Sequence, residues 1–600
     1  MAAITERPNA LTDRLGECTP DEVVGLLRQT DSQMFAGWGG HPGLSDHSIV
    51  EEMAAVSRAA ATVLTADNGV VVLSGCGTSG RVAFVVATAC NALLAPRPPR
   101  FKYIMAGGDP ALFTSREAPE DSWADGLRTL KAAAEGASAV LLVGITCGLS
   151  APFVASQLEF ARAQPDLFTT VLLGFNPPSL ARTVPIEGWD KTFSDVVKAM
   201  LGTKGCHLLL PVVGPEALTG STRMKGGSAT KIMLETMLGA AIQGAVGGAP
   251  APAPAPAITA DTIWAALREY EVAIRSTYFS RPAIAELVAL GGRALTAGGR
   301  LFYLGAGPYG VAALVDASEC PPTYNAGWDE VRAFLRGGYS TLGNAEGDLL
   351  AKYPEHDQYT LEWAGGFDAA VLGKLAPEDA VIFVLGTEGD DAAMVAEAEH
   401  LAVKVAARGA PVGLLTAGPA GAPAEAEGLR QHCVVGVHLE LPTVAPSVVA
   451  KAAGRYGNFL AEIGIKLVLN AVTTGGHVMK GKILGNRMVD LQVSNNKLFY
   501  RTIGIVAACA GVADEPGAEA HARTAVLRAL YGLDKVPLEV EKKDISEHVA
   551  ESARAIAREV RVVPTAVLLC RTPQLSFADA CAQLKGCPNV GVLLEKSAAE

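Results

Sequence analysis

The sequence predicts an α/β fold in which two related parallel sheets precede a small all-helical domain. Short β-branched apolar runs alternate with helix-length patterns, which is typical of βαβ units and of a parallel sheet. The pattern occurs twice: Gly75 and Gly305 end similar runs about 230 positions apart, and Lys231 and Lys466 lie in similar segments about 235 positions apart. A near-constant offset indicates an internal duplication. After residue 505 the chain is rich in alanine and leucine with helical periodicity, which predicts the helical domain.

The composition is typical of a well-buried α/β protein. Of the 600 residues, 49% are hydrophobic and 19% are charged, and the formal net charge is −12. This charge argues against a nucleic-acid surface and against a basic membrane patch, so we expect neither partner. The eleven cysteines include no Cys-x-x-Cys pair, and the ten histidines show no metal-ligand spacing. We therefore expect reduced thiols, no metal and no cofactor.

The N-terminal sequence, MAAITERPNALTDRL, has no apolar signal core. No run approaches about 18 uninterrupted apolar residues, so we expect no membrane-spanning helix. These observations predict a cytoplasmic protein. A nuclear location stays open, although the sequence has no clear basic import cluster.

The stretch Val70–Arg81, VVVLSGCGTSGR, predicts an anion site. A buried strand ends in glycines and hydroxyls, and an apolar helix-like run begins at Val82. Glycines let the backbone come close to a ligand, a helix start offers free N–H groups, and Thr78 and Ser79 add hydroxyl donors. The stretch has neither the Gly-Lys-Ser/Thr of a nucleotide P-loop nor the full Gly-x-Gly-x-x-Gly spacing. The alternative is an ordinary tight turn between a strand and a helix.

Other loops of the first copy lie at the same predicted edge of the sheet. Gly107–Asp109, Thr146–Ser150 and Asn176–Ser179 each follow a predicted strand. Because ligands of such sheets bind beyond the carboxyl ends of the strands, these loops favour a ligand at Thr78 and Ser79. Residues 218–231, LTGSTRMKGGSATK, add hydroxyls, a glycine pair and three cations before a helix. We interpret them as a further wall of the site, the alternative being a capped helix with a solvated basic turn.

The second copy differs from the first where the anion would bind. A Pro/Ala tract at residues 247–258, GGAPAPAPAPAI, predicts a linker and a domain boundary. Beyond it, Arg300–Gly310 matches the opening stretch, but Pro308 and Tyr309 stand where the first copy has Thr78 and Ser79. The turn at residues 387–391, TEGDD, is acidic. A phosphate would meet a bulky ring and like charge there, so we expect one site, in the first copy.

Several motifs resemble those of the glucokinase regulatory protein family and occur in the same order. They are SGCGTSGR (74–81), SREAPEDS (115–122), GLSAPFVA (148–155), GFNPPSLAR (174–182), LTGSTRMKGGSATKIMLETM (218–237) and VSNNKLFYR (493–501). The resemblance covers nearly the whole chain, apart from the linker and parts of the second copy. The wider family includes the N-acetylmuramic acid 6-phosphate etherases, which are built from one copy, and residues 316–324, DASECPPTY, are closer to the etherase pattern.

This resemblance implies two tandem sugar-isomerase (SIS) domains, each with a flavodoxin-like parallel sheet flanked by helices, and a C-terminal all-helical lid. The family's regulators bind fructose phosphates and inhibit a glucokinase- or hexokinase-type enzyme by direct binding. By motif, the phosphate would lie on Gly77, Thr78, Ser79, Thr146 and Gly148, with Ser221 nearby. Glu117 and Glu120 would face the sugar hydroxyls, and Lys497 would reach in from the segment before the lid.

The alternative function is that of the etherases, a carbon–oxygen lyase that releases D-lactate. It needs two carboxylates, one to remove a proton and one to assist loss of the lactyl ether. The first copy has Glu120 but carries Ala89 where the second glutamate belongs, and the second copy has Glu319 without the hydroxyl loop. We therefore expect a regulator rather than an enzyme, with Glu319 an inherited residue that is hydrogen-bonded structurally; the alternative is that the two copies form a pseudo-dimer that brings Glu319 to the first site. In that case Glu120 and Glu319 would be the catalytic pair, acting on an amino-sugar phosphate.

The predicted domains follow from these observations. They are an N-terminal helical segment (1–50), the sugar-phosphate-binding SIS domain (51–246), the linker (247–258), a second SIS domain with a degenerate phosphate loop (259–504) and the helical lid (505–600).

Overall fold

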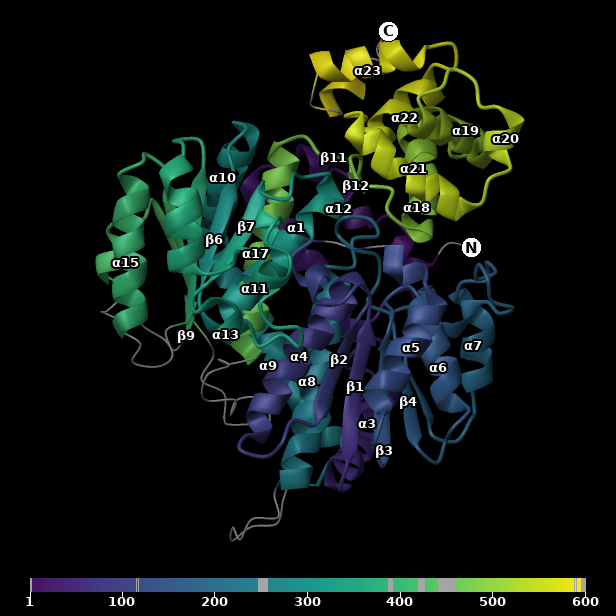
Figure 1. Ribbon diagram of the computed structural model, residues 1–600, viewed down its shortest axis with the longest axis vertical. Helices are drawn as coiled ribbons and strands as arrows, with labels where there is room; N and C mark the ends of the chain where they lie inside the picture. The colour runs from purple at the N-terminus through teal and green to yellow at the C-terminus, as the bar shows by residue number, and fades with distance from the viewer. Residues whose placement is uncertain are drawn as a thin grey trace.

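The computed structural model contains two α/β domains and a helical domain (Figure 1). It describes residues 3–114, 116, 118–246, 257–386, 392–418, 427–440, 459–587, 589 and 591–594. Residues 247–256 of the predicted linker (247–258) and the acidic turn at 387–391 lie outside these residues. The helical domain, yellow in Figure 1, lies above the first domain.

The first sheet is parallel and has the strand order β2-β1-β3-β4-β5. Its strands are β1 (Gly69–Gly75), β2 (Phe101–Met105), β3 (Ala139–Ile145), β4 (Phe168–Leu173) and β5 (Cys206–Leu209). Its helices are α3 (His47–Thr65), α4 (Gly77–Leu94), α5 (Trp123–Ala134), α6 (Pro152–Arg162), α7 (Phe193–Met200) and α8 (Lys225–Val246). This strand order is the flavodoxin-like order, and its switch point lies between β1 and β3.

The second sheet repeats the first, with the order β7-β6-β8-β9-β10. Its strands are β6 (Leu301–Gly305), β7 (Val331–Leu335), β8 (Ala380–Gly386), β9 (Val412–Gly418) and β10 (Val435–Glu440). Its helices are α9 (Ala260–Thr277), α10 (Arg281–Thr296), α11 (Gly307–Ser318), α12 (Cys320–Tyr324), α13 (Gly338–Leu342), α14 (Leu349–Lys352), α15 (Ala392–Ala406), α16 (Glu427–Arg430) and α17 (Phe459–Met479). The predicted duplication is therefore visible in the topology.

The duplication extends to one close backbone contact. A Cβ atom on Gly80 would lie 2.8 Å from the carbonyl oxygen of Gly75, and one on Gly310 would lie 2.6 Å from the carbonyl carbon of Gly305. In each copy the last glycine of the first strand thus packs against a glycine in the first turn of the next helix. Only glycine leaves room for this approach, which sets where each helix begins.

Alternating side chains of β1 separate two apolar layers. Val71 and Leu73 are part of one continuous core that includes residues of both sheet domains and of the helical domain, whereas Val70 and Val72 pack on the opposite face with α5 and α6. Helix α17 is buried along nearly its whole length. Helices α4 and α17 have the length and hydropathy of a membrane span, but most of α4 and all of α17 lie inside this core.

The helical domain contains α18 (Asn496–Ala510), α19 (Ala518–Tyr531), α20 (Leu538–Glu541), α21 (Ile545–Ala557), α22 (Val562–Arg571) and α23 (Phe577–Gly586), and the hairpin β11 (Ile483–Leu484) and β12 (Arg487–Met488) precedes it. Helix α18 runs across residue 505, where the sequence predicts a domain boundary. The N-terminal segment holds α1 (Pro20–Asp31), with a Thr19–Glu22 capping box, and α2 (Gln33–Ala36). It also contacts the hairpin, because Gly16 N donates to the carbonyl oxygen of Gly485 (2.7 Å).

Two helices begin earlier than the sequence predicts. Helix α4 begins at Gly77 rather than Val82, and α8 begins at Lys225 rather than Ile232. The glycine- and hydroxyl-rich stretches that resemble loops are the first turns of these helices. Thr78 and Ser79 therefore lie in a helix N-terminus, where backbone N–H groups lack intrahelical partners.

Candidate functional site

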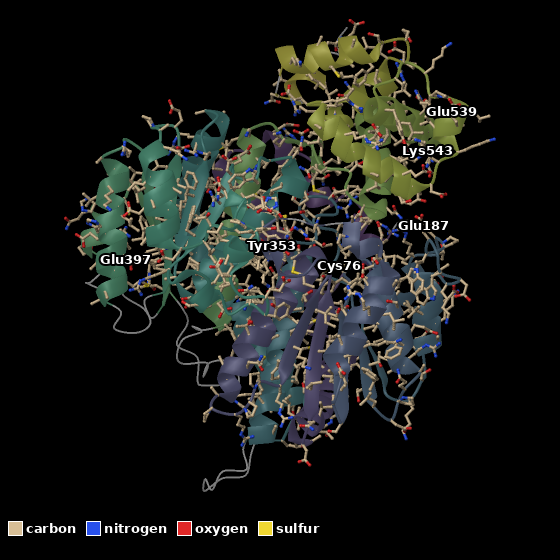
Figure 2. The ribbon with its side chains drawn as sticks, viewed as in Figure 1. Cys76, Glu187, Tyr353, Glu397, Glu539 and Lys543 are labelled. Atoms are coloured by element: carbon tan, nitrogen blue, oxygen red, sulfur yellow. The ribbon has the colours of Figure 1, made fainter. Side chains whose placement is uncertain are left out.

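One pocket lies where the carboxyl ends of β1 and β3 meet α11 and α18. Figure 2 shows Cys76, the N-cap residue of α4, at the junction of the two sheet domains. All predicted site residues that the structure describes line this pocket: Gly77, Thr78, Ser79, Glu120, Thr146, Gly148, Ser221, Glu319 and Lys497. Glu117 lies outside the described residues. The structure thus brings together residues that are separated by up to about 420 positions in the sequence.

The first wall of the pocket is the start of α4. Cys76 is in an extended conformation, and its carbonyl oxygen accepts from Ser79 N (3.1 Å). Ser79 is buried, and its Oγ lies 3.7 Å from Sγ of Cys147 in the loop after β3. Burial raises the pKa of the Cys147 thiol to about 11, so this side chain is neutral at pH 7. The wall presents hydroxyls and helix N–H groups without a thiolate, which suits an anion.

The second wall is the tight loop after β3, residues 146–150. Leu149 has φ of 53°, and its N–H donates to the carbonyl oxygen of Thr146 (3.1 Å). Ser150 N donates to Oγ1 of Thr146 (3.3 Å). A Cβ atom on Gly148 would be in ordinary contact with Ser150 Oγ (3.4 Å) and Thr5 Oγ1 (3.9 Å), and Gly148 itself lines the pocket. A left-handed backbone conformation is strained at a residue other than glycine, and Leu149 adopts it here. In the resulting tight loop, Thr146 and Gly148 both line the pocket.

The third wall joins the first domain to α18. Glu120, in the 3-10 turn Ala118–Asp121, is buried and accepts from Lys497 Nζ at 3.0 Å (Oε1) and 2.9 Å (Oε2). Asn495 Nδ2 also donates to Glu120 Oε2 (3.1 Å). Asn495 is the N-cap of α18, since its Oδ1 accepts from Leu498 N (2.8 Å). Glu120, which the resemblance places against the sugar hydroxyls, and Lys497, which it places beside the site, are therefore partners of each other in this structure.

The fourth wall comes from the second domain. Glu319, at the C-terminal end of α11, reaches the first-domain pocket, where its Oε1 accepts from Thr78 Oγ1 (2.6 Å) and from Arg81 Nη1 (2.6 Å). Arg81 is fully buried. The second carboxylate that the first copy lacks at Ala89 is thus supplied by the second copy.

Two pocket residues escape prediction from the sequence. Glu6, in the 3-10 turn Ile4–Glu6, accepts from Arg501 Nε (2.8 Å) and Nη2 (2.7 Å), and both residues line the pocket. Burial works to raise the pKa of Glu6, but Arg501 outweighs it, and the pKa lies below its ordinary value. A Cβ atom on Gly220 would lie 2.7 Å from Arg501 Nε. The N-terminal segment, the Gly220 loop and α18 thus close one side of the pocket together.

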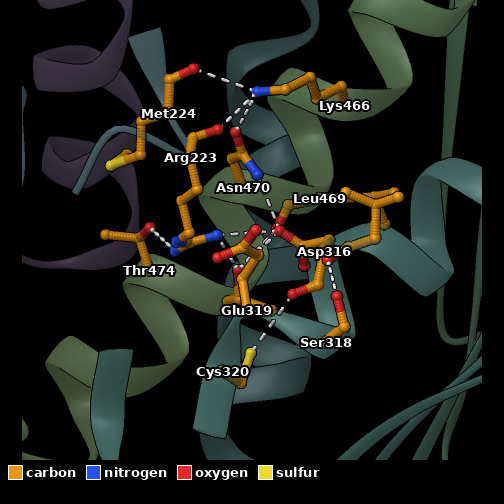
Figure 3. A network of polar contacts seen from close by, with 12 residues as sticks. Arg223, Met224, Asp316, Ser318, Glu319, Cys320, Lys466, Leu469, Asn470 and Thr474 are labelled. Atoms are coloured by element: carbon orange, nitrogen blue, oxygen red, sulfur yellow. Dashed lines mark hydrogen bonds and ion pairs between the residues drawn. The ribbon is translucent and has the colours of Figure 1, made fainter. Parts of the chain in front are cut away.

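The basic residues at the start of α8 are engaged in buried polar contacts. Arg223 donates to Asp316 Oδ1 (3.0 Å) in α11 and to Tyr324 Oη and Thr474 Oγ1 (Figure 3). Lys225 Nζ donates to Gln33 and to the carbonyl oxygen of Pro215, and Lys231 is paired with Glu235 and Glu462. Four residues of the stretch 218–231 border the pocket: Gly220, Ser221, Thr222 and Arg223. The two lysines of the stretch, Lys225 and Lys231, lie in the protein interior.

The corresponding position of the second copy is filled. The ring of Tyr309 is buried in the first turn of α11, and a Cβ atom on Gly386 would lie 2.3 Å from its Cε2 atom. The tyrosine ring therefore packs against the end of β8. The matching strand of the first copy is β3, and Thr146 follows the end of that strand.

The fold and this site define a class of protein with two SIS domains, a helical lid and one pocket shared by all three parts. Three family models match the chain: "Glucokinase regulatory protein N-terminal SIS domain" at residues 52–162, "Glucokinase regulatory protein, second SIS domain" at 278–480 and "C-terminal lid domain of glucokinase regulatory protein" at 485–594. The chain belongs to the glucokinase regulatory protein family.

Curated relatives agree with this assignment. The glucokinase regulatory protein of Xenopus laevis is 34% identical over 94% of this chain and 88% of its own length, and that of Homo sapiens is 34% identical over 98% and 91%. The N-acetylmuramic acid 6-phosphate etherase of Aliivibrio salmonicida is 33% identical over 42% of this chain and 77% of its own length. Among solved structures, the C-terminal domain of glucosamine-fructose-6-phosphate aminotransferase from Francisella tularensis aligns at 12% identity with a TM-score of 0.41, over 77% of this chain and 95% of that one.

Proposed function

We propose that the protein is a sugar-phosphate-binding regulator that inhibits a glucokinase- or hexokinase-type enzyme by direct binding, under the control of fructose 6-phosphate and fructose 1-phosphate. The observation that carries this proposal is the shared pocket. The hydroxyls of Thr78 and Ser79 lie at the N-terminus of α4, and the hydroxyl of Thr146 lies in the loop after β3 that lines the same pocket, an arrangement that suits a phosphate. Carboxylate and ammonium groups on the facing walls suit sugar hydroxyls.

A regulator needs a ligand site that several movable parts share. Here the pocket is lined by both sheet domains, by α18 of the helical domain and by Glu6 of the N-terminal segment. A ligand that binds one arrangement of these parts more tightly than another shifts the population toward it. The glucokinase regulatory proteins of Xenopus laevis and Homo sapiens align over 88% and 91% of their own length, which supports a regulator rather than an enzyme.

The etherase activity is a second candidate, favoured by one observation. Glu120 and Glu319 line the same pocket, so the two carboxylates that this reaction needs are present. Both are engaged, however: Glu120 with Lys497 and Asn495, and Glu319 with Arg81 and Thr78. We therefore propose binding without turnover.

Two assays separate the candidates. The purified chain is added to a glucokinase-type enzyme with and without fructose 6-phosphate or fructose 1-phosphate; we expect inhibition whose strength depends on the sugar phosphate. The same preparation, at high concentration, is incubated with N-acetylmuramic acid 6-phosphate, and lactate is measured; we expect none. If the wild type releases lactate, Glu120→Gln does not, and the wild type does not inhibit the kinase, the protein is an etherase and the proposed regulator function is wrong.

A further inference from the structure

The carboxylate of Glu319 lies on the phosphate loop itself. Its Oε1 accepts a 2.6 Å hydrogen bond from the Thr78 hydroxyl, which stands in the first turn of α4 among the groups proposed to hold the phosphate. The side chain of Glu319 is 9% exposed. An anion of the second domain thus occupies a donor of the first-domain anion site.

This arrangement makes the carboxylate and an incoming phosphate competitors. A hydroxyl has a single hydrogen to donate, and Thr78 gives it to Glu319. A phosphate on Thr78 must take that hydrogen bond. Two anions on the same hydroxyl also repel each other strongly in a poorly hydrated pocket. The Glu319 carboxylate must therefore leave Thr78 when a phosphate arrives.

The neighbouring arginine offers a second position for the same carboxylate. Arg81 is fully buried and donates to Glu319 only through Nη1 (2.6 Å). Its Nε and Nη2 atoms are buried and have no hydrogen-bond partner among the described residues. Buried N–H groups of this kind are costly to leave unpaired. A carboxylate that leaves Thr78 can pair with these groups in the two-bond geometry that guanidinium favours.

Glu319 is also connected to the interface between the two sheet domains. It follows Asp316 by three residues, and Asp316 Oδ1 accepts from Arg223 of the first domain and from Asn470 (2.8 Å) and Thr473 (3.1 Å) of α17. Figure 3 shows Glu319 beside this network. Glu319 is also the N-cap residue of α12. Glu319 therefore stands at the junction of α11 and α12, and its side chain joins this junction to Thr78 and Arg81 of the first domain.

We propose that Glu319 is a resident anion of the site, whose carboxylate accepts from the Thr78 hydroxyl when no ligand is bound. The phosphate of a sugar displaces this carboxylate onto the free N–H groups of Arg81. Ligand binding to the first domain is thereby transmitted to α11 and α12 of the second domain. The inference rests on the proposed function, because it assumes that a phosphate binds at Thr78. It adds the route by which that binding reaches the rest of the molecule.

The first test measures binding of inorganic phosphate and of fructose 6-phosphate to the full chain by calorimetry. Glu319→Gln keeps an oxygen that can accept from Thr78 and Arg81 but removes the competing charge, so we expect the Kd for inorganic phosphate to fall about tenfold. Glu397→Gln is the matched control, since it removes the same charge from the outer helix α15 of the same domain (Figure 2) and leaves the Kd unchanged. A Kd for phosphate that is equal in wild type and Glu319→Gln overturns the inference.

The second test needs no variant and so does not depend on the folding of one. Hydrogen exchange of the wild-type chain is followed with and without fructose 6-phosphate. We expect the ligand to change the protection of Cys320–Tyr324 as well as that of the α4 N-terminus. Ligand protection confined to the first domain contradicts the inference and leaves the proposed function intact, whereas absence of any binding to the wild type contradicts both.

Discussion

Lys497 Nζ lies 3.0 Å from Oε1 and 2.9 Å from Oε2 of Glu120, and this ion pair joins α18 to the first domain at the mouth of the pocket. Both side chains are largely withdrawn from water, at 28% and 7% exposure. A sugar phosphate that enters the pocket meets a cation already oriented by a carboxylate. In the proposed function, this pair links ligand binding to the position of the helical domain.

Replacement of this lysine should weaken ligand binding. Lys497→Met removes a charge-assisted hydrogen bond, which is worth about 1.5–3 kcal/mol, so we expect at least about a tenfold rise in the Kd for fructose 6-phosphate. Lys535→Met, at an exposed lysine of the same domain that does not line the pocket, serves as the control and should bind like the wild type. Equal affinity in Lys497→Met and the control would remove Lys497 from the site.

The buried pair of Arg223 and Asp316 should carry much of the stability of the interface between the sheet domains. Both side chains are 2% exposed. Asp316→Ala leaves the guanidinium buried without its counter-ion, which costs about 3–5 kcal/mol of apparent unfolding free energy. The partly exposed pair of Arg336 and Glu397 gives the comparison, and Glu397→Ala should cost no more than about 1 kcal/mol. Chemical denaturation measures both, and similar losses in the two variants would contradict this account.

Stability should fall as the pH rises through the titration of Glu216. Its carboxylate accepts from Lys225 N (2.9 Å) and Gly226 N (2.8 Å) at the start of α8, and burial raises its pKa from 4.5 to about 7. A carboxyl whose pKa is higher in the folded chain keeps its proton there while the unfolded chain loses it. Stability from this group is therefore complete below pH 4.5 and lost between about pH 4.5 and 7, with a slope of at most about 1.4 kcal/mol per pH unit.

Glu216→Gln tests this pH dependence. The glutamine cannot ionise, so the stability advantage of the wild type over the variant should be largest near pH 4.5 and shrink toward pH 7. Melting temperatures of both proteins across this range provide the measurement. A difference that stays constant with pH would show that Glu216 does not titrate there.

The chain should bind one sugar phosphate. The buried ring of Tyr309 packs against Gly386 in the second copy, whereas the first copy has the hydroxyls of Thr78 and Ser79 at the matching positions of its helix. We expect calorimetry to give one fructose 6-phosphate per chain, and Tyr309→Phe, which keeps the ring, to leave both stoichiometry and affinity unchanged. Two sites per chain in the wild type would contradict the assignment of a single pocket.

Much of the fold follows from local sequence. The buried apolar run predicted from Val70 is β1 (Gly69–Gly75), and the two copies share one strand order because each has the same series of strands and crossovers. The starts of α4 and α8 are missed because glycines and hydroxyls have low helix propensity. At Gly75 and Gly80 the close packing of strand against helix overrides that propensity.

The site is predicted in part for a similar reason. Thr78, Ser79 and Thr146 can be located from loop chemistry and motif resemblance, because each lies in a glycine- and hydroxyl-containing segment directly after a predicted strand. The partners of Glu319 and the pairing of Glu6 with Arg501 depend on how distant segments pack, at separations of about 240 and 495 positions, and no local pattern contains that information. Nothing in the sequence around Glu6 or Arg501 indicates that these two residues pair with each other.

The most direct test of the account is calorimetric titration of the full chain with fructose 6-phosphate and fructose 1-phosphate, in the wild type and in Ser79→Ala. Ser79 is buried in the first turn of α4 and holds no ion pair, so the substitution removes one hydroxyl with little expected change in stability. The account predicts binding of at least one of the two sugar phosphates at a single site in the wild type, and loss of that binding in Ser79→Ala. Undetectable binding of both ligands to a folded wild-type chain, or equal binding by Ser79→Ala, would contradict it.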